Sequence, residues 1–375
     1  MRIGVVGSGV SALACASDLT FHGHDVVVYE AGAHVGGHAQ TVLVDDTYVD
    51  VGFQVFNTVT YPNMLSWFSK HGVQLERSDM SFAVSVENGW YGACAWSSRG
   101  LNGLFAQRTN AANPKFYQML NDMFRFETDA LRYLQDLGCR NDRNIRRTVA
   151  QFLKAHNYSV YFINYYLLPV VAAVWSCSTA VCAEFPALFL LRYIVVSRLV
   201  SFMRNHRMLQ SPLKPRPQWI TVAGRSQEYV RKVSAPFADK IRVNCEGMDL
   251  SFNIPLRYPW LMGVCALSMS MAAVTSLTTY VDALRSNHNS IQVVMGCHAP
   301  DTLRILNASG VPLSKHEREI LSSFKYQEND VYLHHDTSVM PKNKRAWASW
   351  NFIGFTTSPK MSVCCTYWLN LLQNL

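Results

Sequence analysis

The sequence predicts an α/β fold in which a Rossmann-like nucleotide-binding domain is interleaved with a largely helical substrate domain. Three observations indicate this fold: a glycine-rich turn between a short apolar strand and a helix at the N-terminus, a long helical middle, and a return of alternating strands and helices after residue 217. At 375 residues, the chain is long enough for one large domain or two interleaved ones.

The first strand, turn and helix have the pattern of a dinucleotide-binding unit. Residues 3–6 form an apolar run with β-branched side chains, typical of a buried parallel strand, and Gly7 follows where the backbone must turn. Gly9 lacks a side chain, so a pyrophosphate can approach the backbone at the positive end of the next helix. Ala12 takes the third glycine position and is small enough for close helix packing. The helix itself is predicted over residues 11–21.

An acidic residue, Glu30, closes the second predicted strand, 23 positions after Gly7. A carboxylate about 20 residues along the chain meets the ribose hydroxyls in such units. The same carboxylate repels a 2′-phosphate, which argues against NADP. A glycine-rich turn in an ordinary α/β unit is the alternative, but strand, turn, helix and acid all fall in register.

A second glycine pair, Gly36 and Gly37, resembles the flavoprotein form of this motif. The resemblance is to flavin-dependent amine oxidases and phytoene desaturases, and it implies FAD rather than a nicotinamide, within a flavoprotein of the GR2 type. His38 either faces the flavin or its pyrophosphate, or caps a loop. The expected cofactor-binding residues are Gly7, Ser8, Gly9, Val10, Ser11, Ala12, Glu30, Gly36, Gly37 and His38.

Charge and cysteine content limit the partners. The formal net charge is +8, but Lys and Arg form no long run, and the densest patches are residues 140–147 and 342–345. Solvated faces are the simpler interpretation, and contact with acidic lipid head groups or a nucleotide phosphate is the alternative. We expect no nucleic-acid partner. The ten cysteines show neither a CxxC pair nor zinc-like spacing, so we expect no metal site and no disulfide, in a reducing compartment.

Two long stretches without charged side chains raise the question of a membrane span. Residues 155–183 contain His, Asn and Pro, so a buried core segment is the preferred interpretation. Residues 258–281 are rich in Ser and Thr, and for them both interpretations, a membrane span and a buried segment, remain open. The first strand starts at the N-terminus with no signal peptide before it, which favours the cytoplasm.

Further elements follow in order. Hairpins are predicted over residues 41–50 and 81–91, the second with an Asn-Gly turn, and a helix over residues 113–137. Gly52 and Asn57 lie near the flavin in a flavoprotein of this kind, or are simply a strand end and a turn. The apolar residues 165–200 form buried helices that either line a substrate cavity or make a plain core.

These elements predict four domain segments. Residues 1–80 are the FAD-binding part, residues 81–217 the mainly helical substrate part, residues 218–310 the return to the nucleotide-binding domain with a divergent insert at 251–290, and residues 311–375 strands of the substrate domain.

Several blocks carry a more specific resemblance. The blocks are residues 56–57 with 60–63, 79–85, 215–219 with 223–226, 297–301 and 332–336. They resemble the amine-oxidase-like flavoprotein region at the N-terminal end of plant cyclopropane-fatty-acid synthases, over nearly the whole chain. The resemblance implies an FAD-binding fold and an oxidoreductase linked to lipid modification, and we expect a lipid-like substrate and peripheral membrane contact.

This chain departs from that family at its end. The plant proteins continue into a methyltransferase part, and relatives carry a C-terminal glycine-rich segment that completes the flavin site. Neither is expected here, so we do not transfer cyclopropane synthase activity and expect a C-terminally truncated flavin site.

No catalytic residue is predicted, because the flavin itself accepts the hydride or electrons. Residues 334–336, His-His-Asp, resemble an acid/base or metal cluster, but neighbours on a strand point to opposite faces. Three hypotheses remain: an FAD-dependent oxidoreductase for an apolar amine or lipid-like substrate, a non-catalytic nucleotide-binding remnant, and a nicotinamide dehydrogenase, which the second glycine pair disfavours.

Overall fold

The computed structural model describes residues 1–87, 92–139, 147–197, 218–245, 292–310, 312–326, 328–355 and 362–375. The Asn-Gly turn of the second hairpin, most of the basic patch at 140–147, the insert at 251–290 and the apolar stretch at 258–281 lie outside these residues.

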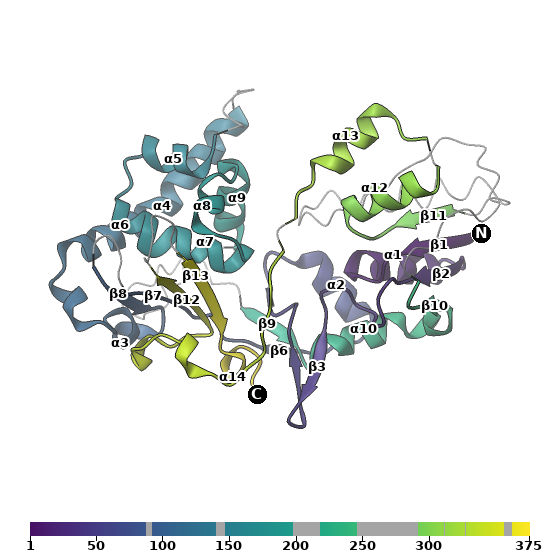
Figure 1. The fold of residues 1–375 in the computed structure, drawn as a ribbon, viewed down its shortest axis with the longest axis horizontal. Helices are drawn as coiled ribbons and strands as arrows, with labels where there is room; N and C mark the ends of the chain where they lie inside the picture. The colour runs from purple at the N-terminus through teal and green to yellow at the C-terminus, as the bar shows by residue number, and fades with distance from the viewer. Residues whose placement is uncertain are drawn as a thin grey trace. The chain divides into compact units, whose positions relative to one another are not determined.

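The chain divides into two units that alternate along the sequence (Figure 1). Unit 1 contains Met1–Phe56, Tyr61–Glu76 and Thr221–Glu328, and unit 2 contains Asn57–Thr60, Arg77–Ile220 and Asn329–Leu375. The α/β class, with a nucleotide-binding fold interleaved with a largely helical domain, is therefore confirmed.

Unit 1 is built on a four-stranded parallel sheet. β1 (Arg2–Val6) lies between β2 (Asp25–Tyr29) and β11 (Gln292–Met295), and β10 (Ile241–Arg242) pairs with the other side of β2. In chain order these strands lie third, second, first, fourth across the sheet, which is the order of a dinucleotide-binding half. The direction of winding reverses between β1 and β11, and ligands of such folds bind beyond the carboxyl ends of the strands at this point.

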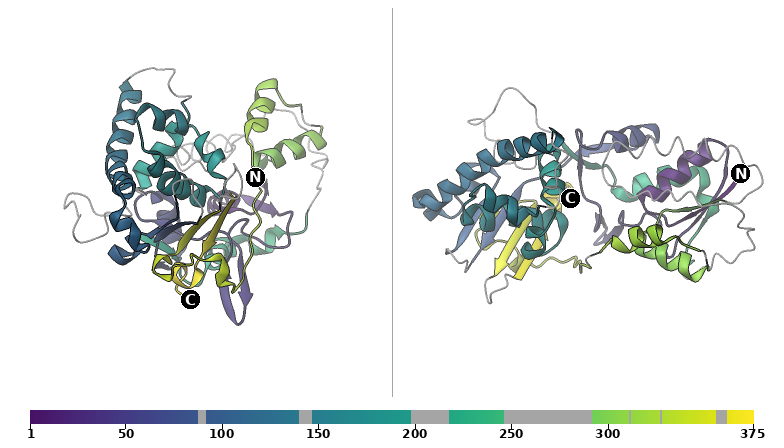
Figure 2. Two further views of the ribbon diagram at one scale, coloured as in Figure 1. Left: turned by 60° about the vertical axis from the view of Figure 1, so that its left-hand side comes forward. Right: turned by 90° about the horizontal axis from the view of Figure 1, so that it is seen from above.

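Helix α1 (Val10–Phe21) connects β1 to β2 and packs against them, as Figure 2 shows. Its inner face is apolar at helical spacing, and Ala12, Leu13 and Ala16 are completely buried. Gly23, at φ +78°, allows the chain to leave the helix in the left-handed conformation, as the sequence predicts.

The other elements of unit 1 surround this sheet. They are the hairpin β3 (Thr41–Val44) and β4 (Thr47–Asp50), α2 (Pro62–Lys70), α10 (Ser226–Ser234), η5 (Ala235–Lys240), α12 (Ala299–Ala308) and α13 (Lys315–Ser323).

Unit 2 contains a mixed four-stranded sheet with helices packed against it (Figures 1 and 2). The order is β13 (Ser362–Tyr367), β12 (Trp350–Phe355), β7 (Phe82–Val86), β8 (Cys94–Ser97). β12 and β7 are parallel, and the two outer pairs are antiparallel. All five residues of β7 are buried, so this strand is covered on both faces.

The helical part of unit 2 contains one long helix and several short ones. Helix α4 (Pro114–Cys139) continues past Gly138, which the sequence predicted as its end; one glycine costs a helix only about 1 kcal/mol, so it need not end one. The other helices are α3 (Gly100–Leu104), η1 (Arg108–Ala112), α5 (Val149–Ala155), α6 (Val160–Phe162), η3 (Ile163–Leu167), α7 (Leu168–Trp175), α8 (Thr179–Ala183), α9 (Ala187–Ser197), η6 (Thr337–Val339), η7 (Lys344–Ala346) and α14 (Leu369–Leu372).

Three of the five changes of unit fall inside short strands, β5 (Phe56–Asn57), β6 (Leu75–Arg77) and β9 (Trp219–Val222). The other two lie between Thr60 and Tyr61 and between Glu328 and Asn329, whereas the last predicted boundary follows residue 310. Within the described ranges, none of the helices has both the length and the apolar character required to cross a membrane.

Candidate dinucleotide site

The glycine-rich turn lies where the strand order reverses. Gly7 follows β1 at φ +94°, and a Cβ there would lie only 3.1 Å from the backbone nitrogen of Cys297, which follows β11. A side chain is thus disfavoured at Gly7 by both conformation and space. The turn places the start of α1 beyond the carboxyl ends of β1 and β11.

Gly9 leaves the N-terminus of α1 open. It is the N-cap residue of the helix, in an extended conformation with φ −65°, and provides no side-chain cap. A Cβ built on Gly9 would meet no heavy atom within 4 Å. The first N–H groups of an α-helix have no partner within the helix, and together with its dipole they favour an anion. The open space above Gly9 therefore matches the needs of a pyrophosphate.

Close packing of α1 on the sheet depends on small residues. Ala12 is completely buried, and a Cβ added at Gly296 would lie 2.6 Å from the Cβ of Ala12. This contact supports the prediction that Ala12 allows the helix to approach the strands. Its partner, Gly296, follows the end of β11.

Glu30 holds the glycine turn from the end of β2. Its Oε2 accepts hydrogen bonds from the backbone nitrogen of Ser8 at 2.8 Å and from Ser8 Oγ at 2.5 Å, and its Oε1 accepts one from the nitrogen of Gly32 at 2.8 Å. An ionised carboxylate has about four acceptor positions. These three bonds therefore leave capacity for one further donor, such as a ribose hydroxyl.

The second glycine pair folds back onto the first turn. The nitrogen of Gly36 donates to the backbone oxygen of Ser8 at 3.1 Å, and a Cβ on Gly37 would lie 3.0 Å from the Cα of Gly9. Both glycines have positive φ angles, +123° and +59°. The structure thus brings the two glycine motifs together around Ser8, which is completely buried.

His38 continues this loop and stacks on His298, which in turn stacks on Tyr326; neither of these two rings was among the predicted site residues. The His38 ring lies 5.7 Å from that of His298 at an interplanar angle of 23°, and His298 stacks on Tyr326 at 4.5 Å. His298 is the N-cap residue of α12 and lies three positions after the last residue of β11, Met295. Its position at the carboxyl end of a strand next to β1 is the signal that could have found it.

Gly52 and Asn57 have local structural roles. A Cβ on Gly52 would lie 2.0 Å from the carbonyl oxygen of His38, so the backbone passes directly beside the His38 loop. Asn57 Oδ1 accepts hydrogen bonds from the nitrogens of Val59 and Thr60, both at 2.9 Å, which forms a turn. The buried Nδ2 of Asn57 has no hydrogen-bond partner in the described part of the chain.

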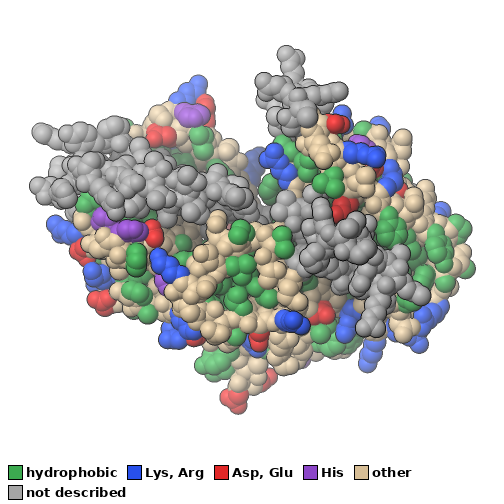
Figure 3. Space-filling model, turned by 180° about the vertical axis from the view of Figure 1, so that it is seen from behind, with side chains coloured by type: hydrophobic (Ala, Val, Ile, Leu, Met, Phe, Trp, Pro, Cys, Tyr) green, Lys and Arg blue, Asp and Glu red, His purple; other side chains and the backbone are tan. Residues whose placement is uncertain are grey.

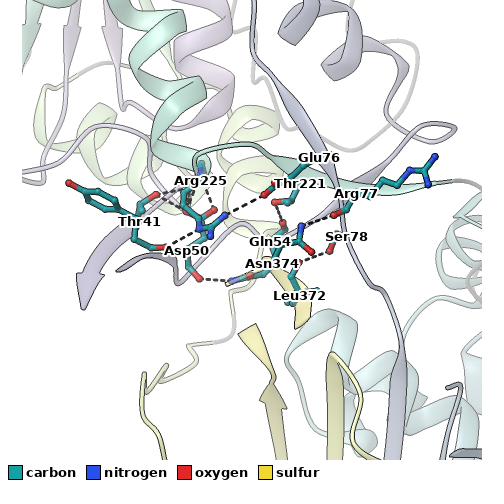
Figure 4. A network of polar contacts seen from close by, with 12 residues as sticks. Thr41, Asp50, Gln54, Glu76, Arg77, Ser78, Thr221, Arg225, Leu372 and Asn374 are labelled. Carbon is teal, nitrogen blue, oxygen red and sulfur yellow. Dashed lines mark hydrogen bonds and ion pairs between the residues drawn. The ribbon is translucent and has the colours of Figure 1, made fainter. Parts of the chain in front are cut away.

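A buried carboxylate attaches the 41–50 hairpin to helix α10 (Figure 4). Asp50, only 1% exposed, accepts hydrogen bonds from the nitrogen and Oγ of Ser226 at 2.8 and 2.6 Å and from Thr41 Oγ1 at 2.6 Å. A carboxylate at the first turn is favoured by the helix dipole. Arg225, at φ +77°, donates from Nε to the carbonyl of Tyr48 at 2.9 Å. This contact network fixes the segment that continues to Gly52.

The His-His-Asp block lies in an exposed loop of unit 2. Asp336 caps the short helix η6 by accepting a hydrogen bond from the nitrogen of Ser338 at 2.8 Å, and the nitrogen of Asp336 donates to His334 Nδ1 at 3.1 Å. These contacts define a local turn. In the described ranges, His, Cys, Asp and Glu side chains form no group of three that could hold a metal ion.

The parallel sheet, its strand order and the double glycine loop define a dinucleotide-binding protein of the Rossmann class. A model of the family described as flavin containing amine oxidoreductase matches residues 10–193, just under half of the chain. The match includes α1, Glu30 and the second glycine pair. FAD is the cofactor, as the second glycine pair predicts.

Individual relatives match shorter segments. A probable zeta-carotene desaturase from Synechococcus elongatus is 34% identical over 73 residues, 19% of this chain and 15% of the desaturase. An L-amino-acid oxidase from Sistrurus catenatus edwardsii is 32% identical over 90 residues, 24% of this chain and 16% of the oxidase. Among solved structures, cyclohexylamine oxidase from Brevibacterium oxydans has a TM-score of 0.46 at 15% identity, covering 65% of this chain and 51% of that one. The chain thus spans about half the length of this solved structure, and the curated matches cover about a sixth of each relative.

Proposed function

We propose that this chain is an FAD-dependent oxidoreductase of the amine oxidase type that acts on an apolar amine or a lipid-like substrate. The observation that carries the proposal is the open N-terminus of α1 above Gly9, with Glu30 and the second glycine pair closing around it. In this proposal the first turn of α1 binds the diphosphate and Glu30 binds the ribose. When bound, the flavin supplies the acceptor for a hydride or for electrons.

The interior of unit 2 supports an apolar substrate with one polar group. The layer between the sheet and the helices is aromatic: Trp96 lies 5.7 Å from the ring of Tyr166 and donates from Nε1 to the carbonyl of Tyr165 at 3.0 Å. Two buried donors in unit 2, the Tyr166 hydroxyl and Trp350 Nε1, have no partner within the described residues. Burial raises the pKa of Tyr166, so its hydroxyl stays protonated as a donor. A substrate acceptor atom would satisfy such donors.

Relatives and resemblance support the same substrate class. The names of the two curated relatives refer to a carotene, which is an apolar lipid, and to L-amino acids, which carry an amine. The resemblance to the flavoprotein region of plant cyclopropane-fatty-acid synthases favours the lipid-like alternative, with lipid modification as the metabolic context.

The same proposal covers partners and location. We place the protein in the cytoplasm, with its substrate and a membrane surface as partners and no nucleic acid. On the face shown in Figure 3, Lys and Arg side chains are scattered among Asp, Glu and hydrophobic ones, whereas a nucleic-acid partner calls for a basic stripe. A methyltransferase part, as in the plant proteins, remains a candidate partner of this chain.

The test is flavin loading followed by anaerobic reduction. Purified protein, reconstituted with FAD, is expected to show a bound-flavin spectrum that bleaches when an apolar amine or an unsaturated lipid is added without oxygen. Bound FAD that no member of either class reduces supports the non-catalytic remnant instead. Tight NADH binding with no FAD binding would overturn the flavin assignment.

A matched variant separates substrate binding from folding. Tyr166→Phe removes an unpaired buried hydroxyl, whose burial costs about 1–3 kcal/mol, so the free protein is expected to be at least as stable as the wild type. Reduction of the bound flavin should nevertheless require a higher substrate concentration. Unchanged substrate dependence would exclude Tyr166 from substrate binding.

A further inference from the structure

Three cysteines of unit 2 lie together where the α7–α8 loop meets β13. Cys177 and Cys182 have their Sγ atoms 3.3 Å apart. Cys365, on β13, interacts electrostatically with both of them, and its burial raises its pKa to about 12. Tyr367, on the same strand, contacts the side chain of Ser176. Cys177 and Cys182 are neighbours in one segment, whereas Cys365 comes from β13, so its proximity to them is a product of the fold.

We propose that Cys177 and Cys182 are a thiol pair that peroxide closes into a disulfide, which makes this loop a site of reversible oxidative modification. The inference does not depend on flavin binding or on the proposed oxidoreductase activity. The oxidant is hydrogen peroxide or an organic hydroperoxide, the class of molecule that also results when a flavin enzyme passes electrons to dioxygen.

The loop geometry permits the closure. A disulfide needs an S–S distance of about 2.05 Å, so the two sulfurs must approach each other by roughly 1.2 Å. Cys177 lies between the end of α7 at Trp175 and the start of α8 at Thr179, outside both helices. Its neighbour Ser176 has φ +49°, so the loop turns sharply here rather than continuing the helix. The movement therefore needs no helix to unwind.

The two thiols differ in exposure, which assigns their roles. Cys177 is partly exposed and Cys182 is completely buried. The sulfur of Cys177 attacks one peroxide oxygen, the O–O bond breaks, and the released hydroxide or alkoxide takes the thiol proton, which leaves a sulfenic acid. The sulfur of Cys182 then attacks the sulfenic sulfur, the S–O bond breaks, and water leaves with the proton of Cys182. The peroxide gains two electrons, one from each thiol.

The pH dependence follows from the same environment. Burial raises the pKa of Cys177 and, more strongly, that of Cys182, where the hydrogen bond to Cys177 adds to the effect. Since the thiolate is the reactive form, oxidation should be slow at neutral pH and should accelerate as the pH rises.

The sequence offers a direct mass-spectrometric test. Trypsin cleavage after Lys154 and Arg192 releases one peptide, residues 155–192, that contains both cysteines and no other. The full chain is treated with hydrogen peroxide in its native state, denatured, alkylated with N-ethylmaleimide and digested. We expect this peptide to lose both alkylation sites and to be two hydrogens lighter than the unmodified dithiol form. Reduction with dithiothreitol before alkylation should restore both sites.

Control residues and variants make the outcome specific. Cys94 is completely buried, so it should escape oxidation and become alkylated once the protein is denatured. This result would show that the fold remained closed during the peroxide treatment. Cys182→Ser should trap Cys177 as a sulfenic acid that reacts with dimedone, and Cys177→Ser should leave Cys182 reduced at the same peroxide dose. Circular dichroism melting of each variant checks folding.

Two results would overturn the proposal, and both are visible in the wild-type chain. One is alkylation of both Cys177 and Cys182 after a peroxide dose that oxidises the partly exposed Cys245. The other is cross-linking of peptide 155–192 to the C-terminal peptide 361–375, which would assign Cys365 or its neighbour as the partner instead.

Discussion

Replacing Gly9 by alanine separates cofactor binding from folding more cleanly than any other change at the site. The new methyl group meets no heavy atom within 4 Å, and φ is −65°, which suits any L-residue. The free protein thus has room for the side chain. The methyl occupies the space above the first turn of α1, where the proposal places the diphosphate of FAD.

Two effects on stability nearly cancel. Alanine is a poorer N-cap residue than glycine, at a cost of about 0.5–1 kcal/mol. It also lowers the entropy of the unfolded chain, which stabilises by about 0.4–1 kcal/mol. We expect the free energy of unfolding to change by less than about 1 kcal/mol. Loss of one charge-assisted hydrogen bond to the diphosphate costs about 1.5–3 kcal/mol, which weakens FAD binding roughly 10- to 150-fold.

The assay is an FAD titration, followed by flavin fluorescence, beside urea unfolding of the same apoprotein. Gly4→Ala is the matched control, because it adds the same methyl group on β1, in ordinary contact 3.6 Å from the ring of Tyr29. It should bind FAD as the wild type does. If Gly9→Ala also binds FAD with unchanged affinity, the diphosphate does not lie above α1 and the proposed site is wrong.

Three further changes test separate parts of the structure. Asp50→Asn removes the charge from the carboxylate that accepts hydrogen bonds from Ser226, so urea unfolding should show a loss of about 1.5–3 kcal/mol; an unchanged midpoint would contradict the capping role. Glu30→Gln weakens both the proposed ribose contact and the hydrogen bonds to Ser8. The loss of one hydrogen bond of about 1.4 kcal/mol should make FAD binding about tenfold weaker in a titration. Equal affinity would show that Glu30 does not contact FAD. Burial raises the pKa of Cys94 from 9.0 to about 11, so the folded state retains its thiol proton while the unfolded state loses it. Stability is therefore expected to fall by about 2–3 kcal/mol between pH 9 and 11, and Cys94→Ala should make this decline shallower in urea melts; parallel declines would refute the assignment.

Local signals in the sequence predicted the glycine loops correctly. Turn, helix start and acid are determined by residues within about thirty positions of each other, and each has its own steric or electrostatic reason. The open space at Gly9 agrees with that local reasoning, whereas the contact of Glu30 with Ser8 was not predicted. The hairpin at 41–50 was also predictable from local sequence, because the alternating pattern of its two strands and the Asp-Asp turn between them were sufficient to identify it.

Long-range contacts could not be read in the same way. Nothing near Asp50 indicates that it caps a helix starting at Ser226, 176 positions away. His298 and Tyr326 join His38 only because β11 pairs with β1, a choice made by packing rather than by local propensity. The neighbouring strand that pairs with β7, predicted within the 81–91 hairpin, is β8 at Cys94–Ser97, and the second partner of β7, β12, lies far along the chain where no local pattern indicates it.

The strand pairing of unit 1 also determines when this protein can fold during its synthesis. Ile3 on β1 pairs with Gln292 on β11, 289 residues later. At about 5–20 residues per second, roughly 15 to 60 seconds pass between the synthesis of the two strands. During this time one edge of β1 is unpaired, and an exposed apolar strand edge favours association with other chains. The contact between Gly7 and the chain after β11 is also not yet formed, so the nascent protein cannot complete its nucleotide site until late in translation.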